Sequence, residues 1–242
     1  MNRVHPILWT NIFILAVIYL IACQKINPAS PETPSPTQPA GREFVYNFDK
    51  DVVGKIAASF HTALTGSGAK GDWVVRTDTT APSQPNLLAQ MSADDTSYRF
   101  PLAIADEGSF QNLEMSVKFK PVSGSGDQAA GLVWRLKDSN NYYIVRANAL
   151  EGNVVLYKVE NGIRTDLPLK DEGRTYGKKV SVPSGQWSTL GVTAQDKLFS
   201  VYFNGEKIYE VEDQTFKGAG KVGLWTKADS VTYFDDLRVI AR

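Results

Sequence analysis

Planar, charged and aromatic side chains recur in the middle of the chain, on alternate positions of strand-like segments. The segments span residues 130–137, 141–150, 153–159 and 221–228. On the face expected to point outward they place cationic, amide and aromatic groups: Arg135, Tyr142, Arg146, Asn148, Lys158, Trp225 and Lys227. Aromatic rings stack on the C–H face of a pyranose, and guanidinium or amide groups bind its hydroxyls. The pattern predicts a sugar-binding platform.

The same residue types are also typical of a solvated sheet face. Long Lys and Arg side chains lie along such a surface with their charges in water, and a lone Trp packs beneath a loop. A row of cations with few facing acids is unusual where Lys plus Arg and Asp plus Glu are balanced at 26 each. Both interpretations stay open.

Acid–base chemistry has few candidates. Retaining endoglucanases of β-sandwich folds place carboxylates in an E-x-D-x-x-E pattern along one strand, and this chain has no such pattern. Most acidic pairs lie beside Gly, Ser or Thr, where solvated turns are expected. Glu151, at a strand end next to the platform, is the one candidate catalytic residue. His61 could act as a base, although a single histidine beside Phe60 is more often structural.

A structural Ca²⁺ site is the candidate for a bound metal. Alternation with Leu237 and Val239 turns Asp235 toward the buried face, and a buried carboxylate needs a partner. Asp49 could meet Asp235 or Asp236 around a Ca²⁺ ion, which prefers oxygen ligands. The alternative is an Asp235 held by N–H donors or by an arginine.

Composition excludes several classes of function. Balanced charge leaves no surplus of cations for a phosphate backbone, so we expect no nucleic-acid partner. One cysteine, Cys23, and two histidines exclude a disulfide framework, a Cys/His zinc site and a Cys/His nucleophile.

The first 42 residues predict export and lipid anchoring. Residues 1–22 combine Arg3 with an apolar stretch and no acid, which is the profile of a cleaved signal peptide, and the alternative is an uncleaved membrane anchor. Leu20-Ile21-Ala22-Cys23 resembles the lipobox of bacterial lipoproteins, which implies lipidation of Cys23. Residues 23–42 carry five prolines and read as a linker, leaving 43–242 as one domain.

The sequence of that domain predicts an all-β fold. Leu113, Met115, Val117 and Phe119 alternate with polar residues, as in a half-buried strand. Asn161-Gly162 and Asn204-Gly205 predict two-residue hairpin turns. Side chains at alternate positions of a strand share one face, which predicts that one set on the three central strands points into the core. This set is Leu132, Trp134, Leu136, Tyr143, Val145, Ala147, Ala149, Val155, Tyr157 and Val159. No stretch has a sustained helical period.

A family resemblance covers nearly the whole domain. The matching elements, in chain order, are GDWVV (71–75), LAQ (88–90), FKPVS (119–123), GLVWR (131–135), NYY (141–143), VRAN (145–148), GLWT (223–226) and FDDLRV (234–239). The domain resembles the concanavalin A-like jelly-roll modules of the LamG and 3-keto-disaccharide hydrolase type found in bacterial envelope proteins. The resemblance implies a two-sheet antiparallel sandwich with a concave sheet, and glycans as the ligand class.

We therefore expect a lipid-anchored protein of the bacterial cell envelope, outside the cytoplasm, whose jelly-roll domain binds a glycan. It would meet the membrane through its lipid only. Two alternatives remain: a glycoside hydrolase of the 3-keto-disaccharide type, and a non-catalytic LamG-like module that binds protein.

Overall fold

A computed structural model describes residue 1 and residues 37–242, and residues 37–242 lie in one compact unit. The predictions for the signal peptide, for Cys23 and for most of the linker lie outside the described residues. Within 37–242 there is no helix that is long and apolar enough to cross a membrane.

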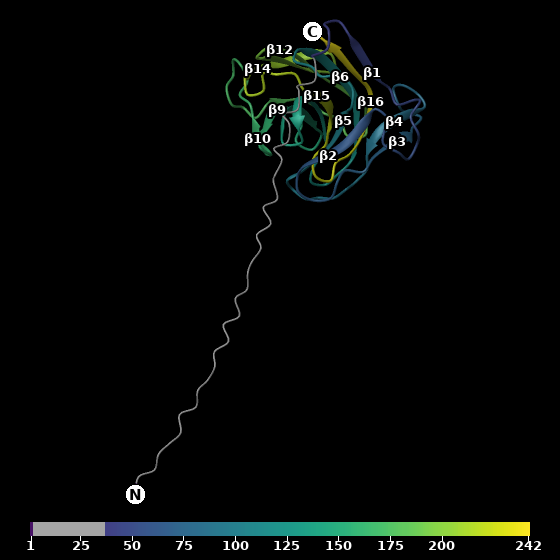
Figure 1. The fold of residues 1–242 in the computed structure, drawn as a ribbon. Coiled ribbons are helices and arrows are strands. Elements are labelled where there is room, and N and C mark those ends of the chain that lie inside the picture. The colour runs from purple at the N-terminus through teal and green to yellow at the C-terminus, as the bar shows by residue number, and fades with distance from the viewer. Residues whose placement is uncertain (2–36) are drawn as a thin grey trace. The chain divides into compact units, whose positions relative to one another are not determined.

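The domain is a sandwich of two antiparallel sheets, which confirms the predicted jelly roll (Figure 1). The first sheet runs in the order β14 (Glu206–Glu212), β13 (Leu198–Phe203), β12 (Ser188–Gln195), β6 (Leu113–Ser123), β16 (Val231–Ala241), β4 (Asn86–Gln90) and β3 (Trp73–Thr77), with β1 (Glu43–Tyr46) beside β16.

The second sheet carries the predicted site. Its order is β10 (Ile163–Asp166), β9 (Asn153–Glu160), β8 (Asn141–Asn148), β7 (Ala129–Asp138), β15 (Lys221–Trp225), β5 (Arg99–Ala105) and β2 (Phe60–Gly66), with β11 (Lys178–Lys179) beside β9. In Figure 1 the labels of the first sheet run from β14 and β12 at the upper left to β4 and β3 at the right, and those of the second run from β10 at the left through β15 and β5 to β2 at the lower centre.

Local sequence explains several of these elements. Burial alternates strictly along the start of β6, as its apolar period predicts. Asn161 and Gly162 turn between β9 and β10 with φ of 51° and 80°, and Asn204 and Gly205 turn between β13 and β14 with φ of 50° and 85°. Positive φ at both positions is the geometry that Asn-Gly favours, so both hairpin predictions are confirmed.

The main core lies between the sheets. Trp134 is fully buried there, with its ring 5.5 Å from Tyr143 and 5.3 Å from Phe199 between centroids. Leu132, Val145 and Ala147 share this core, and Ala149 packs against it. The inward face predicted for most of the first two central strands is therefore correct.

The predicted alternation of inward and outward side chains is wrong in two places. Arg135 adopts φ 47° within a shift of register between β7 and β8, and this bulge turns Leu136 to the opposite face. On β9 the core residues are Val154 and Leu156. The predicted inward positions of Val155, Tyr157 and Val159 are wrong, because these three side chains face away from the core. Both faces of β9 are apolar, and alternation alone could not choose between them.

The far face of the second sheet is itself a buried apolar cluster. It is buried because the sheet coils until the strands at its β2–β5 end approach the β9–β10 and β7–β8 turns. At one meeting point the Tyr98 hydroxyl donates to the Gly162 carbonyl at 2.9 Å and accepts from the Arg164 N–H at 2.7 Å. At another the Thr65 hydroxyl binds the Ser139 carbonyl. Strand twist accumulates across a sheet of this width, so β5 and β10 approach each other although four strands separate them.

Candidate functional site

Trp225 lies at the centre of the coiled face. It faces away from the main core, as parity predicts, but it is fully buried rather than exposed. Its ring stacks on Phe100 at 5.2 Å between centroids and 20° between planes. Gly131 on the neighbouring strand leaves room for the indole, because a Cβ there would lie 3.2 Å from Trp225 Cε3 and 2.5 Å from a methyl of Ile144. The expected open platform is in fact the inner side of the coiled sheet, which we call the hollow, and its centre is filled by packed side chains.

Arg164 on β10 forms part of the roof of this hollow. Its guanidinium carbon lies 4.7 Å from the ring centroid of Phe100, 4.5 Å from Tyr157 and 5.8 Å from Trp225. These are cation–π distances. The sequence does not point to this residue, because nothing in the short segment IRTD indicates that β10 folds over β5.

Arg146 is the second cation of the hollow and is fully buried. Its guanidinium donates to both carboxylate oxygens of Glu151, at 2.7 and 3.0 Å, and to the Asn153 side chain at 2.9 Å. It also lies over the rings of Tyr157 and Tyr176, at 5.7 and 6.0 Å. Burial disfavours its charge, but the Glu151 carboxylate outweighs burial and raises the pKa of Arg146.

A chain of polar side chains extends from this ion pair. The Asn148 amide donates to Asp127 at 2.8 Å and to Glu151 at 3.2 Å. Lys227 in turn forms an ion pair with the buried Asp127 at 2.6 Å. The structure thus brings together four of the predicted site residues, Arg146, Asn148, Glu151 and Lys227, in one network on the same sheet as Trp225.

Three buried N–H donors on this face have no hydrogen-bond partner among the described residues. They are Arg146 Nε, Arg164 Nη1 and Trp225 Nε1. Most buried polar groups in proteins are hydrogen-bonded, and leaving one unpaired costs free energy. Trp73 Nε1 and Trp134 Nε1 in the main core are also unpartnered, so the two guanidinium donors are what distinguish this face as a site for a ligand rich in acceptor oxygens.

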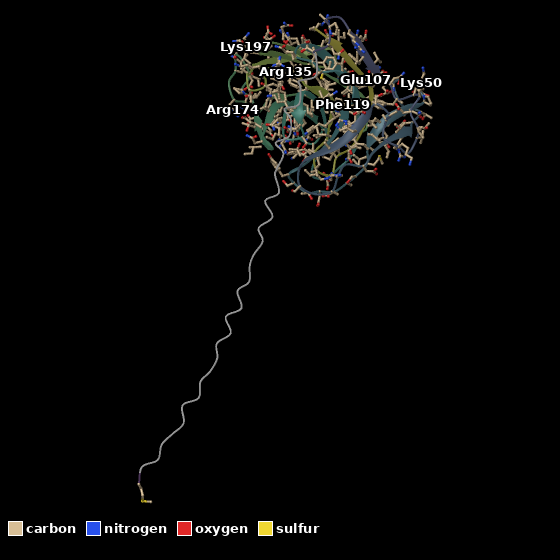
Figure 2. All side chains as sticks on the ribbon, viewed as in Figure 1. Lys50, Glu107, Phe119, Arg135, Arg174 and Lys197 are labelled. Atoms are coloured by element: carbon tan, nitrogen blue, oxygen red, sulfur yellow. The ribbon has the colours of Figure 1, made fainter. Side chains whose placement is uncertain are left out.

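Other predicted platform residues lie elsewhere. The buried Arg135 donates to the backbone carbonyls of Gln111, Phe216 and Asp196, and lines a separate hollow of about 390 Å³ with Lys197 (Figure 2). Its left-handed backbone within the bulge accounts for the displacement.

Lys158 and Tyr142 also differ from the expectation. Lys158 donates to Thr215 at 2.9 Å, and because β9 has the opposite parity to the one predicted, it points away from the Trp225 face. Tyr142 does lie on the Trp225 face, but it is fully buried and its hydroxyl pairs with Thr65 at 2.8 Å.

Glu151 does not have the properties of a catalytic acid. Burial favours its neutral form, but the Arg146 guanidinium outweighs burial and lowers the pKa of Glu151 to about 2. At neutral pH the group is a carboxylate whose two oxygens are both bound by donors. Its place in the structure is that of a counter-ion.

A histidine–aspartate pair lies at the edge of the same sheet. His61 Nδ1 is 2.5 Å from Asp106 Oδ1, and both side chains are about half exposed. His61 pairs across the ladder with Ile104, on the strand that supplies Phe100. An aspartate that fixes one imidazole nitrogen leaves the other free for proton transfer, so His61 has a partner that the sequence could not show.

The predicted Ca²⁺ ligands do not converge. Asp235 is buried and accepts from the backbone and hydroxyl of Ser83, both at 2.8 Å, and burial raises its pKa to about 6. Asp49 accepts from the Asn86 N–H at 3.1 Å, and Asp236 pairs with Lys118 at 2.9 Å. Residues 37–242 contain no group of three His, Cys, Asp or Glu that could hold a metal. Asp235 is therefore held by N–H and hydroxyl donors, which is the alternative that the sequence left open.

Fold and site together define a jelly-roll β-sandwich with a polar and aromatic hollow on one sheet. The chain belongs to the family described as the 3-keto-alpha-glucoside-1,2-lyase-like domain, whose family model matches residues 65–240. No curated protein has a sequence that matches this chain.

Solved structures share the fold at low sequence identity. A carbohydrate binding module, CBM66, from Bacillus subtilis is 19% identical with a TM-score of 0.57, over 74% of this chain and 95% of its own. The cellulose induced protein Cip1 is 12% identical with a TM-score of 0.60, over 82% and 97%. A xylan beta-1,4-xylosidase from Bacillus halodurans C-125 is 15% identical with a TM-score of 0.53; the match covers 88% of this chain but 41% of the xylosidase.

Proposed function

We propose that this protein binds a carbohydrate in the hollow of its second sheet, on a chain held at a bacterial membrane by a lipid on Cys23 and facing out of the cytoplasm. The observation that carries the proposal is the set of three buried, unpartnered donors, Arg146 Nε, Arg164 Nη1 and Trp225 Nε1, among aromatic rings.

The chemistry of the hollow suits a sugar. A pyranose presents a weakly polar C–H face that packs on aromatic rings and a rim of hydroxyl oxygens that accept hydrogen bonds. The exposed ring of Tyr176, which packs on the buried Tyr157, supplies the first surface, and the unpartnered donors supply the second. The names of the structural neighbours support the same class, because one is a carbohydrate binding module and another a xylosidase.

A glycan array tests the proposal, followed by calorimetry on each sugar that binds. Trp225→Phe keeps most of the ring packing but removes the indole N–H, and it should weaken binding by about three- to tenfold. Trp187→Phe is the matched control, because Trp187 packs with the cluster around Leu87 and Ala89, which is separate from the Trp225 cluster. Equal effects of the two substitutions, or no sugar bound by the wild type, would contradict the proposal.

The lipid anchor is tested separately. The acyl chains rather than a spanning helix should hold the mature protein at the membrane. A radiolabelled fatty acid should therefore label the wild type and not Cys23→Ala. Detection of residues 1–22 on the mature protein would contradict lipoprotein processing.

Cleavage of a glycoside is a second candidate function, favoured by the His61–Asp106 pair and by the lyase-like description of the family. A lyase or hydrolase needs a group that takes up and returns a proton, and an imidazole held by a carboxylate is suited to that task. Product analysis with disaccharides and 3-keto-glucosides tests it. Turnover should fall by at least about 100-fold in His61→Gln, and turnover unchanged in that variant would exclude the pair as the catalytic group.

A further inference from the structure

Arg164 is a cation without a counter-ion among the described residues. Its guanidinium forms no ion pair and no hydrogen bond there, and Nη1 is buried without a partner. The side chain lies over the rings of Phe100, Tyr157 and Trp225. Aromatic faces attract a cation, but a ring cannot replace the acceptor oxygens that a guanidinium N–H binds in water.

The three fully buried arginines each have side-chain or backbone acceptors for most of their donors, although Arg146 Nε is left without one. Arg146 is paired with Glu151, and Arg135 donates to three backbone carbonyls. Arg99 donates to the carbonyls of Ala69 and Ala228. The unsatisfied guanidinium of Arg164 is therefore peculiar to the hollow rather than a general feature of this fold.

The nearby carboxylates each form an ion pair with another cation. Asp166, on the same strand as Arg164, is bound by Arg174 at 2.7 Å. Glu151 is held by Arg146, and Asp127 by Lys227. With each of these carboxylates paired, the hollow keeps one uncompensated positive charge at Arg164.

We propose that the sugar bound in this hollow carries a carboxylate, as a uronic acid does, and that Arg164 binds that carboxylate. This inference rests on the proposed carbohydrate-binding function and adds the substrate class. A planar guanidinium matches a carboxylate with two parallel hydrogen bonds. The unpartnered N–H groups of Arg146 and Trp225 remain available for the hydroxyls of the same ring.

The test compares neutral and acidic sugars that are otherwise alike. Calorimetry on the full chain in detergent would use galactobiose against digalacturonate, and cellobiose against its glucuronate-bearing counterpart, with glucose 6-phosphate as a phosphate probe. At least one uronate should bind about tenfold or more tightly than its neutral partner. Arg164→Gln should remove that preference, so that a uronate and its neutral partner bind with equal affinity. Arg164→Lys keeps the charge but loses the planar pair of N–H donors, so it should keep part of the preference for the uronate.

Arg76→Gln is the control, because Arg76 is an exposed arginine on β3 of the other sheet. Thermal melts of each variant show whether the fold is retained. If Arg164→Gln does not fold, the comparison of Arg164→Lys with the wild type tests the inference instead. Neutral and acidic sugars that bind equally would overturn this inference and leave carbohydrate binding standing. A phosphate preferred over every uronate would overturn the carboxylate assignment, and failure of every sugar to bind would overturn both proposals.

Discussion

Replacing Glu151 with glutamine tests whether this side chain is the counter-ion of a buried arginine. Glu151→Gln keeps the shape of the side chain but removes its charge. The Arg146 guanidinium, fully buried, would then have no carboxylate beside it. Removing one partner of a buried ion pair costs about 3–5 kcal/mol, because the remaining charge is left uncompensated. Glu151 is 32% exposed, so water recovers part of this cost and we expect a loss of about 2–3 kcal/mol at pH 7.

The same pair predicts a pH dependence. The pKa of Glu151 is lowered in the folded protein from 4.5 to about 2, so its contribution to stability is complete above about pH 4.5 and is lost as the pH falls toward 2. By about pH 3 the difference between wild type and Glu151→Gln should have fallen to less than half of its value at pH 7.

Urea unfolding at pH 7 and pH 3 measures both effects. Glu172→Gln is the control, since Glu172 pairs with Lys178 at the surface, where both side chains are more than 40% exposed, and it should cost less than about 0.5 kcal/mol. A Glu151→Gln variant as stable as the wild type at pH 7, or a difference that does not shrink at pH 3, would refute the role of Glu151 as counter-ion.

Four further substitutions test the core, the hollow and the leader. Trp134→Ala and Trp225→Ala should each cost about 3–5 kcal/mol in urea melts, because both indoles are fully buried; a much smaller cost for Trp225 would restore the open platform expected from the sequence. Gly131→Ala should destabilise the fold by about 1–3 kcal/mol, since its methyl would overlap Ile144, and an unchanged melting temperature would show that the hollow has spare room. Cys23→Ala should release the protein from the membrane fraction, and retention there would argue for a spanning anchor.

The fold could be predicted from the sequence because its signals are local. Alternation along β6 and the Asn-Gly turns depend on neighbouring residues only. The inward position of Trp134 followed from the same alternation.

The site could be predicted only in part, because its shape depends on contacts between distant strands. Arg146, Asn148 and Glu151 lie close together in the sequence and do form one network. Arg164 meets Phe100 only because the second sheet coils on itself, and no local pattern encodes that approach. Trp225 was predicted on the correct face, but the roof that buries it is formed by distant residues.

The sequence also does not predict that these charged side chains are buried. Arg135 and Arg146 both read as solvated cations on a strand, yet one is bound by backbone carbonyls of separate loops and the other by Glu151. The register shift that redirects Arg135 arises from pairing between β7 and β8, so alternation could not predict it.

The central claim, that a carbohydrate occupies the hollow of the second sheet, is tested most directly by the indole N–H signals of the tryptophans during a sugar titration. The chain has five tryptophans, and the Trp225 signal in a ¹⁵N-correlation spectrum can be assigned from Trp225→Phe. Trp225 Nε1 is an unpartnered donor in the hollow, so its signal should move most as the sugar binds. Trp134, between the sheets, should move little. A titration that shifts the Trp187 signal and leaves Trp225 unchanged would show that the sugar binds elsewhere and would contradict the account.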